Sequence, residues 1–179
     1  MIIQHENICQ KQKYGIFVKI ETSGLDYIND RITELAIKAV NLKTGEELTS
    51  FNTVYEDEGM AGTETTEKII QLFKKNKLNH SSACFFAYSN NFTSTFFSRI
   101  ISPKNQSEHN FPKHWLDIRT LCSTALFVAN AESTPRWHIR SQQFSKKALL
   151  NDFSGVDSGM KGVDTLIRLY YEVQSRLRQ

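Results

Sequence analysis

The chain has 179 residues, of which 40% are hydrophobic and 23% are charged, and its formal net charge is +3. This length and apolar content suit one folded domain with its own core and exclude a disordered chain. The mild positive charge is compatible with nucleic-acid binding but too small to require it. No apolar run reaches the length of a membrane-spanning helix, and the N-terminal residues lack the apolar stretch of a signal peptide, so we expect a soluble protein with no membrane partner.

Three cysteines, Cys9, Cys84 and Cys122, are scattered along the sequence without CxxC spacing. An odd, widely spaced set predicts free thiols in a reducing compartment, with Cys84 and Cys122 filling core space. We therefore expect a cytoplasmic location.

The first third of the chain predicts three antiparallel strands after a polar arm over residues 1–13. Tyr14–Ile20 is rich in β-branched and aromatic residues, which is typical of a buried strand. Arg31–Val40 and Glu47–Val54 have the composition of two further strands, and the segment between them contains Gly45 and suits a hairpin turn. These three strands form a predicted meander.

From about residue 66 onward, helices and short strands are expected to alternate, after an exposed acidic loop that covers residues 55–66. The expected elements are helix Thr66–Lys77, strand Ala83–Tyr88, a helix that contains Phe92, Phe96 and Phe97, strand Trp115–Ile118, helix Thr120–Ala129 and a long amphipathic helix from Val163 to Leu177. This order predicts an α/β fold in which three antiparallel strands precede parallel strands in one mixed sheet, with helices on both faces. We expect residues 14–179 to form a single domain.

Three segments carry recognisable local motifs. The first, Phe17–Leu25 with Asp30–Ala36, is a strand, a Thr-Ser-Gly-Leu turn and a second strand that begins with Asp-Arg-Ile. The second, Phe86–Thr93, is an apolar strand followed by Ser-Asn-Asn-Phe-Thr. The third, Trp115–Leu121, is a strand that leads into a helix. Together they resemble the motifs of the DnaQ-like (DEDD) 3′–5′ exonucleases, over about residues 14–177. The resemblance implies a ribonuclease H-like fold.

In that family, four acids bind the two divalent metals that hold and hydrolyse the scissile phosphate. Residue by residue, the first acid falls on Lys19, the second is kept as Glu21 and the third falls on Thr93. The fourth acid is Asp157, Asp164 or absent. An ammonium at residue 19 repels a metal ion and offers Glu21 an ion pair instead. The resemblance therefore implies an impaired enzyme with Glu21 as its one retained catalytic acid, with no metal site and no cofactor.

Nucleic acid could still contact this scaffold. Candidate binding residues are Lys19, Thr22, Leu25 and Phe92 around the old site, and Trp137 and Arg140 in a basic, aromatic segment. Each has a simpler interpretation as well: Lys19 neutralises Glu21, Phe92 is a core residue, and the basic segment is a solvated surface. For Asp117 we favour a helix cap over a metal ligand.

Three functions follow from these observations. The first is a catalytically impaired 3′–5′ exonuclease-like domain that binds single-stranded DNA or RNA, or a partner in nucleic-acid metabolism, without metal-dependent hydrolysis. The second is a protein-interaction domain on an exonuclease scaffold. The third is an active 3′–5′ exonuclease with a rebuilt Mg²⁺ or Mn²⁺ site that draws on Glu21, Asp117, Asp157 or Asp164. The sequence does not distinguish DNA from RNA, and it allows a homodimer without indicating one.

Overall fold

The computed structural model describes residues 11–55, 62–129, 149–150 and 158–177. Most of the polar arm expected over residues 1–13 lies outside this part of the chain. So does the centre of the predicted acidic loop.

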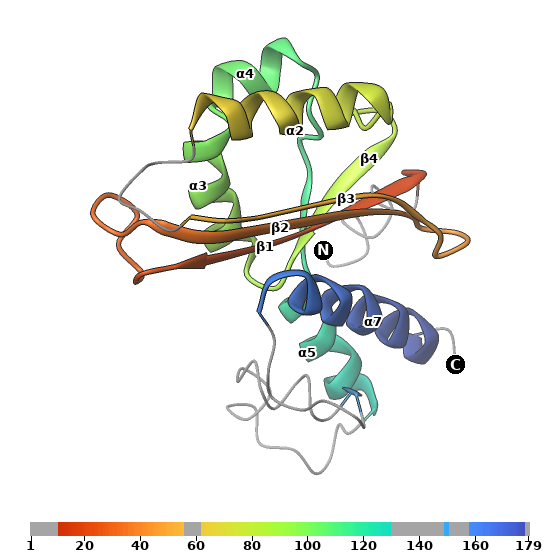
Figure 1. The fold of residues 1–179 in the computed structure, drawn as a ribbon. Helices are drawn as coiled ribbons and strands as arrows, with labels where there is room; N and C mark the ends of the chain where they lie inside the picture. The colour runs from red at the N-terminus through yellow and green to blue at the C-terminus, as the bar shows by residue number, and fades with distance from the viewer. Residues whose placement is uncertain (1–10, 56–61, 130–148, 151–157, 178–179) are drawn as a thin grey trace.

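A mixed sheet of five strands, in the order β3-β2-β1-β4-β5, runs through the middle of the described structure (Figure 1). The strands are β1 Tyr14–Thr22, β2 Ile32–Asn41, β3 Glu47–Val54, β4 Ala83–Ala87 and β5 Trp115–Asp117. β1, β2 and β3 pair antiparallel, whereas β4 pairs parallel with both β1 and β5. The predicted mixed sheet is therefore confirmed.

Helices cover both faces of this sheet, as the sequence predicted (Figure 1). On one face lie α2 Thr63–Lys75, α3 Asn90–Ile100 and α4 Pro103–Glu108; on the other lie α5 Ile118–Ala129 and α7 Gly159–Leu177. The helix α4 was not among the predicted elements. Ser102 caps the amide of Asn105, and Pro103 occupies the first turn of a short helix, where its missing N–H costs nothing. None of the described helices is long and apolar enough to cross a bilayer.

The two faces of β1 belong to two separate core clusters. Ile16, Val18 and Ile20 pack with the α2 and α3 layer, while Phe17 packs under α7 and stacks on Phe86 at a centroid distance of 4.7 Å. Because side chains alternate along a strand, the residues that follow Phe17 on its own face are Lys19 and Glu21. Both polar side chains therefore lie on the α7 side of the sheet.

Two cysteines are fully buried, which confirms their predicted place in the core. Cys84 and Cys122 are both 0% exposed, and Cys122 does not form a disulfide. Cys84 is disulfide-bonded, so the expectation of free thiols was wrong for this residue. Sequence spacing detects neighbouring pairs such as CxxC but places no limit on which distant cysteines meet in the fold.

Candidate functional site

The candidate site lies where the parallel strands β1, β4 and β5 reach their carboxyl ends. Parallel strands end at the same edge of a sheet, and ligands of open α/β folds bind in the loops that follow those ends. Here β1 ends at Thr22, β4 ends at Ala87 and β5 ends at Asp117. The three motif segments of the sequence thus meet at one edge.

At the end of β1, Lys19 and Glu21 form an ion pair. The distance from Lys19 Nζ to Glu21 Oε1 is 2.7 Å, and the two side chains are 17% and 39% exposed. The pairing predicted from the sequence is present. The pair neutralises the carboxylate that the resemblance assigns to metal binding, and it places an ammonium where a second carboxylate would be needed.

On the β4 side, the corresponding groups are uncharged. Thr93 lies in the first turns of α3 with 6% of its surface exposed, and it offers a hydroxyl. Asn90 donates from Nδ2 to the carbonyl oxygen of Trp115 at 3.5 Å, which links the start of α3 to β5. This wall of the site therefore offers amide and hydroxyl groups.

Asp117, at the end of β5, caps a helix. Its Oδ1 accepts the backbone N–H groups of Arg119 at 2.8 Å and Thr120 at 3.3 Å, which confirms the predicted capping of α5. Burial raises the pKa of Asp117 above its ordinary value, against hydrogen bonds that lower it. The register places Asp117 beside Ala87 on β4, two strand spacings or about 10 Å from β1. Asp117 and Glu21 therefore do not share a ligand position.

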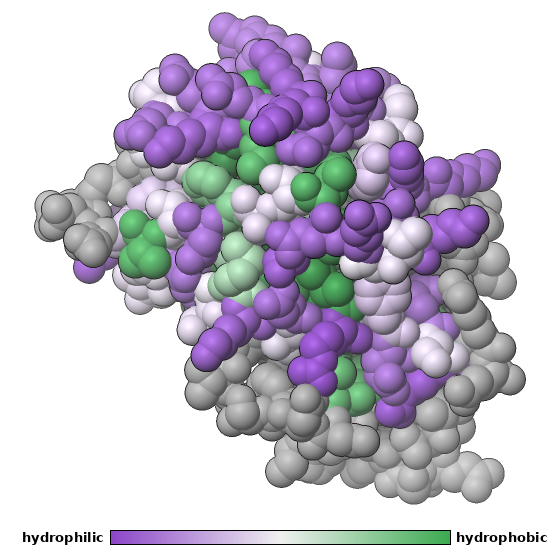
Figure 2. Space-filling view, turned by 45° about the vertical axis from the view of Figure 1, so that its right-hand side comes forward, coloured by the Kyte–Doolittle hydropathy of each residue, from purple (hydrophilic) through white to green (hydrophobic). Residues whose placement is uncertain are grey.

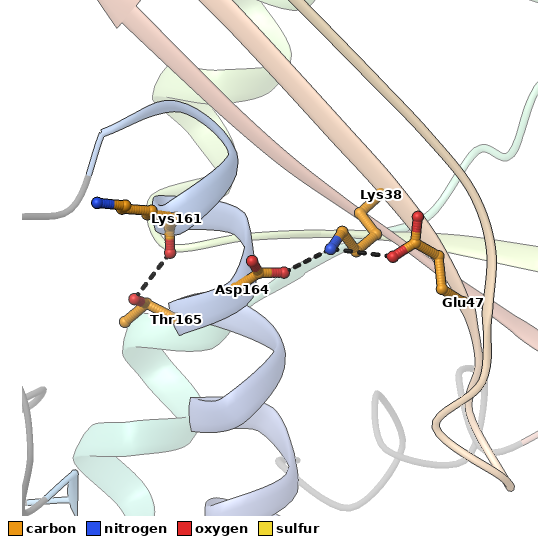
Figure 3. A network of polar contacts seen from close by, with 5 residues as sticks. All are labelled: Lys38, Glu47, Lys161, Asp164 and Thr165. Carbon is orange, nitrogen blue, oxygen red and sulfur yellow. Dashed lines mark hydrogen bonds and ion pairs between the residues drawn. The ribbon is translucent and has the colours of Figure 1, made fainter.

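Asp164, one candidate for the fourth acid, is held by a lysine of the sheet (Figure 3). Lys38 Nζ lies 2.6 Å from Asp164 Oδ1 and 3.0 Å from Glu47 Oε2. Since Lys38 is paired with Phe17 across β1 and β2, this contact lies before the end of β1. The side chain of Lys161, three residues earlier in α7, points away from Asp164 (Figure 3). Asp157 lies outside the described residues.

The donors around Glu21 do not fit a pair of divalent metal ions. Mg²⁺ and Mn²⁺ need several oxygen ligands with negative charge among them. Glu21 is ion-paired, Thr93 is neutral, and Asp164 is bound to Lys38. Across the part of the chain that the structure describes, no three His, Cys, Asp or Glu side chains gather to form a metal-binding group.

The loop between β1 and β2 projects apolar side chains beside this site. Leu25 is 85% exposed and Ile28 is 81% exposed. Arg99 of α3 holds the loop by donating to the carbonyl oxygens of Tyr27, at 2.8 Å, and Asp30. Leu25 was a predicted binding residue, whereas Ile28 was missed. The sequence feature that could have indicated Ile28 is an apolar residue within an otherwise polar turn.

The other predicted binding residues fall into three groups. Thr22 lies beside the ion pair, and its hydroxyl donates to the carbonyl oxygen of Gly24. Phe92 packs against the α2 and α3 core, with its ring centroid 4.8 Å from that of Phe96, as expected for a core residue. Trp137 and Arg140 lie outside the described residues. The structure thus brings Lys19 and Glu21 together, and Thr22 follows them at the end of β1 with its hydroxyl bonded to Gly24.

Comparison of the whole chain with known proteins finds matches among solved structures. No family model matches the sequence, and no curated protein does. The nuclease domain of 3′hExo, a DEDDh family member, bound to rAMP, is 15% identical with a TM-score of 0.63, and the match covers 92% of each chain. A full-length 3′-exonuclease is 14% identical with a TM-score of 0.62, over 92% of this chain and 82% of that one. The chain has the ribonuclease H-like fold of the DnaQ-like exonucleases.

Exonuclease I shares this exonuclease fold over part of its length. Its product-bound structure is 16% identical with a TM-score of 0.59, over 94% of this chain and 45% of that chain. Our chain therefore spans less than half of exonuclease I. Identities this low establish the fold and leave the activity to be argued from the site.

Proposed function

We propose that this chain is a catalytically impaired 3′–5′ exonuclease-like domain that binds single-stranded nucleic acid without metal-dependent hydrolysis. The Lys19–Glu21 ion pair at the end of β1 carries this proposal. The ammonium neutralises Glu21 and repels a divalent cation, so the described residues offer no ligand set for two-metal hydrolysis at this place.

Lys19 supplies a positive charge for a phosphate at the same place. Its side chain is 17% exposed and carries three N–H donors, of which the contact to Glu21 uses one. A lysine acts as a compact point charge toward a phosphate oxygen, and such contacts account for most non-specific affinity for nucleic acid. Lys19 therefore acts as a phosphate contact in this proposal.

The exposed apolar loop supplies a second contact. Leu25 lies three residues after Thr22, on a loop that Arg99 fixes to α3. Apolar and aromatic side chains pack against bases of single strands regardless of sequence. Leu25 and Thr22 would thus hold the terminal nucleotide while Lys19 holds its phosphate.

The similar structures support nucleic acid as the ligand class. The 3′hExo nuclease domain is bound to rAMP, and another 3′-exonuclease structure concerns recognition of the 3′ end of a histone mRNA stem-loop. Exonuclease I forms a complex with SSB-Ct, which supports a protein partner in nucleic-acid metabolism as the second candidate.

The decisive experiment mixes purified protein with end-labelled single-stranded DNA and RNA in Mg²⁺, Mn²⁺ or EDTA. We expect no shortening of either strand in any buffer, and retardation of the strand that persists in EDTA and weakens as salt rises. Lys19→Ala should lower the salt dependence by about one phosphate contact. Lys43→Ala, at an exposed turn, is the matched control.

Stepwise shortening that needs metal and disappears in Glu21→Ala would overturn the proposal in favour of a rebuilt metal site. If the strand is neither shortened nor retarded, the result would favour a protein-interaction domain. The cytoplasmic location stays a prediction.

A further inference from the structure

A groove lies between the edge strand β3 and helix α2. It has a volume of about 480 Å³ and is lined by Phe51 of β3 and by Lys68, Gln71, Leu72 and Lys75 of α2. Phe51 and Leu72 are half-buried and give the groove an apolar floor, while both lysines are exposed. In the space-filling view, small apolar patches lie between hydrophilic side chains on the visible face (Figure 2).

The backbone of β3 has hydrogen-bonding groups that face outward beside this groove. β3 is the last strand of the sheet and lies beneath α2 in Figure 1. Tyr55 N–H donates to Thr33 O of the neighbouring segment at 2.9 Å. Because bonded and non-bonded pairs alternate in antiparallel sheets, Phe51 and Thr53 bond inward to β2, and the peptide groups of Ser50 and Asn52 point outward.

This edge lacks the residues that usually prevent pairing with another strand. β3 is eight residues long and contains no Pro, Lys or Arg. Val54 is 60% exposed and Leu48 is 38% exposed along the same strand. The one charged residue of β3, Glu47, is ion-paired with Lys38 of β2. A long edge with exposed apolar side chains is a template for an added strand.

We infer that β3 and the groove bind an extended acidic peptide of a partner protein, which adds to the sheet as a sixth strand. Its backbone bonds to Ser50 and Asn52. The side chain opposite Phe51 is apolar and enters the groove, and the acidic residues two positions before and after it face Lys68 and Lys75. This interaction is independent of nucleic-acid binding at the end of β1.

Charge favours an acidic peptide over a second copy of this chain. Edge-to-edge pairing of two copies would bring both sets of lysines to the same seam, where like charges repel. In the described structure Lys75 forms no ion pair, and Lys68 contacts Glu64 at 2.6 Å with both side chains largely exposed. Such an exposed contact contributes little and exchanges readily for another carboxylate.

The test titrates the full chain against capped, fluorescein-labelled peptides of the form Thr-Asp-Thr-X-Thr-Asp-Thr, with X as Phe, Leu or Ile. Fluorescence anisotropy should show saturable binding that weakens with salt, and replacing both Asp by Lys should abolish it. Hydrogen exchange gives the location, because an added strand protects the outward amides of Ser50 and Asn52.

Two pairs of variants separate the contacts. The double variant Lys68→Glu/Lys75→Glu should weaken peptide binding by about tenfold or more. The control is the double variant Lys74→Glu/Lys77→Glu, which makes the same charge change outside the groove lining. It should change peptide binding by less than about threefold. Asn52→Pro removes an outward N–H that no β2 bond uses, so it should abolish binding while Asn52→Ala preserves it. Circular dichroism shows whether each variant folds.

Three results would overturn the inference. These are no saturable binding by any of the peptides, binding that the groove variants do not weaken, or protection of Ser50 and Asn52 that rises with protein concentration in the absence of peptide. The last result, together with a dimer in light scattering, would assign the edge to a second copy of the chain.

Discussion

At the scale of single residues, Lys19 has the largest effect on what the end of β1 can bind. Its ammonium lies 2.7 Å from Glu21, with the carboxylate 39% exposed. An ion pair this open to solvent contributes at most about 1 kcal/mol to stability. In the proposed function, the lysine at residue 19 would therefore act on ligand selection, by repelling cations and attracting phosphate, more than on folding.

Lys19→Asp tests this selection directly. The change places a second carboxylate beside Glu21, so we expect measurable Mn²⁺ binding by calorimetry and weaker retention of single strands in EDTA. The free energy of unfolding should change by less than about 1 kcal/mol. Lys43→Asp makes the same charge change at an exposed turn. It should neither create Mn²⁺ binding nor weaken the retention of single strands. Equal loss of strand binding in both variants would show that Lys19 acts only through net charge.

At the scale of helices and strands, local pattern predicted most of the fold. Runs rich in β-branched, aromatic and other apolar residues located the strands, and helical spacing located α2, α3 and α7. Two features escaped it. α4 depends on the cap and proline at Ser102 and Pro103 within a stretch that otherwise suits a loop. The contact between Lys38 and Asp164 spans 126 residues of sequence, and no local pattern predicts which distant charges meet.

The same limit applies to the candidate site. The sequence assigned Lys19, Glu21 and Thr93 to one region, because the first two lie near the carboxyl end of one parallel strand and Thr93 follows the carboxyl end of its neighbour. It left the place of Asp164 open, because α7 can be shifted along the sheet without disturbing its apolar spacing. Only the packed structure shows that the carboxylate of Asp164 forms an ion pair with Lys38.

Asp117 gives a prediction at the scale of helix α5. Its carboxylate accepts two backbone N–H groups in the first turn of the helix, and burial raises its pKa. Asp117→Ala leaves those donors without a partner and should lower the free energy of unfolding by about 1 kcal/mol. Asp117→Asn keeps an acceptor and should retain most of the stability. Urea denaturation at neutral pH measures both. An equal loss in the two variants would mean that charge, not the acceptor, matters.

At the scale of the whole molecule, one lysine connects the C-terminal helix to the edge of the sheet. Lys38 of β2 contacts Asp164 of α7 and Glu47 of β3, and its side chain is 14% exposed (Figure 3). Burial acts to lower the pKa of Lys38, but its hydrogen bonds to Asp164 and Glu47 outweigh burial and raise it. The lysine therefore stays charged, and three elements depend on one ammonium.

This network predicts how stability responds to acid. The hydrogen bond from Lys38, followed by one from Ser50, lowers the pKa of Glu47. A carboxyl group with a lowered pKa contributes stability above its unfolded pKa, about 4.3, and this contribution is lost as pH falls through the lower folded value. Because the Glu47 side chain is 47% exposed, Glu47→Gln should cost less than about 1 kcal/mol at pH 7.

The difference between wild type and Glu47→Gln should therefore shrink as the pH falls below about 4.3 and vanish below the lowered folded pKa of Glu47, as measured by urea denaturation across the pH range. Glu46→Gln provides the control, because this exposed neighbour forms no ion pair within the described residues, and it should cost nothing at any pH. On the alkaline side, the network should hold until the pH exceeds the raised pKa of Lys38, above the usual value of about 10.4. A Glu47→Gln deficit that stays constant from pH 7 to pH 3 would show that the glutamate stabilises β3 through packing, with no part for its charge.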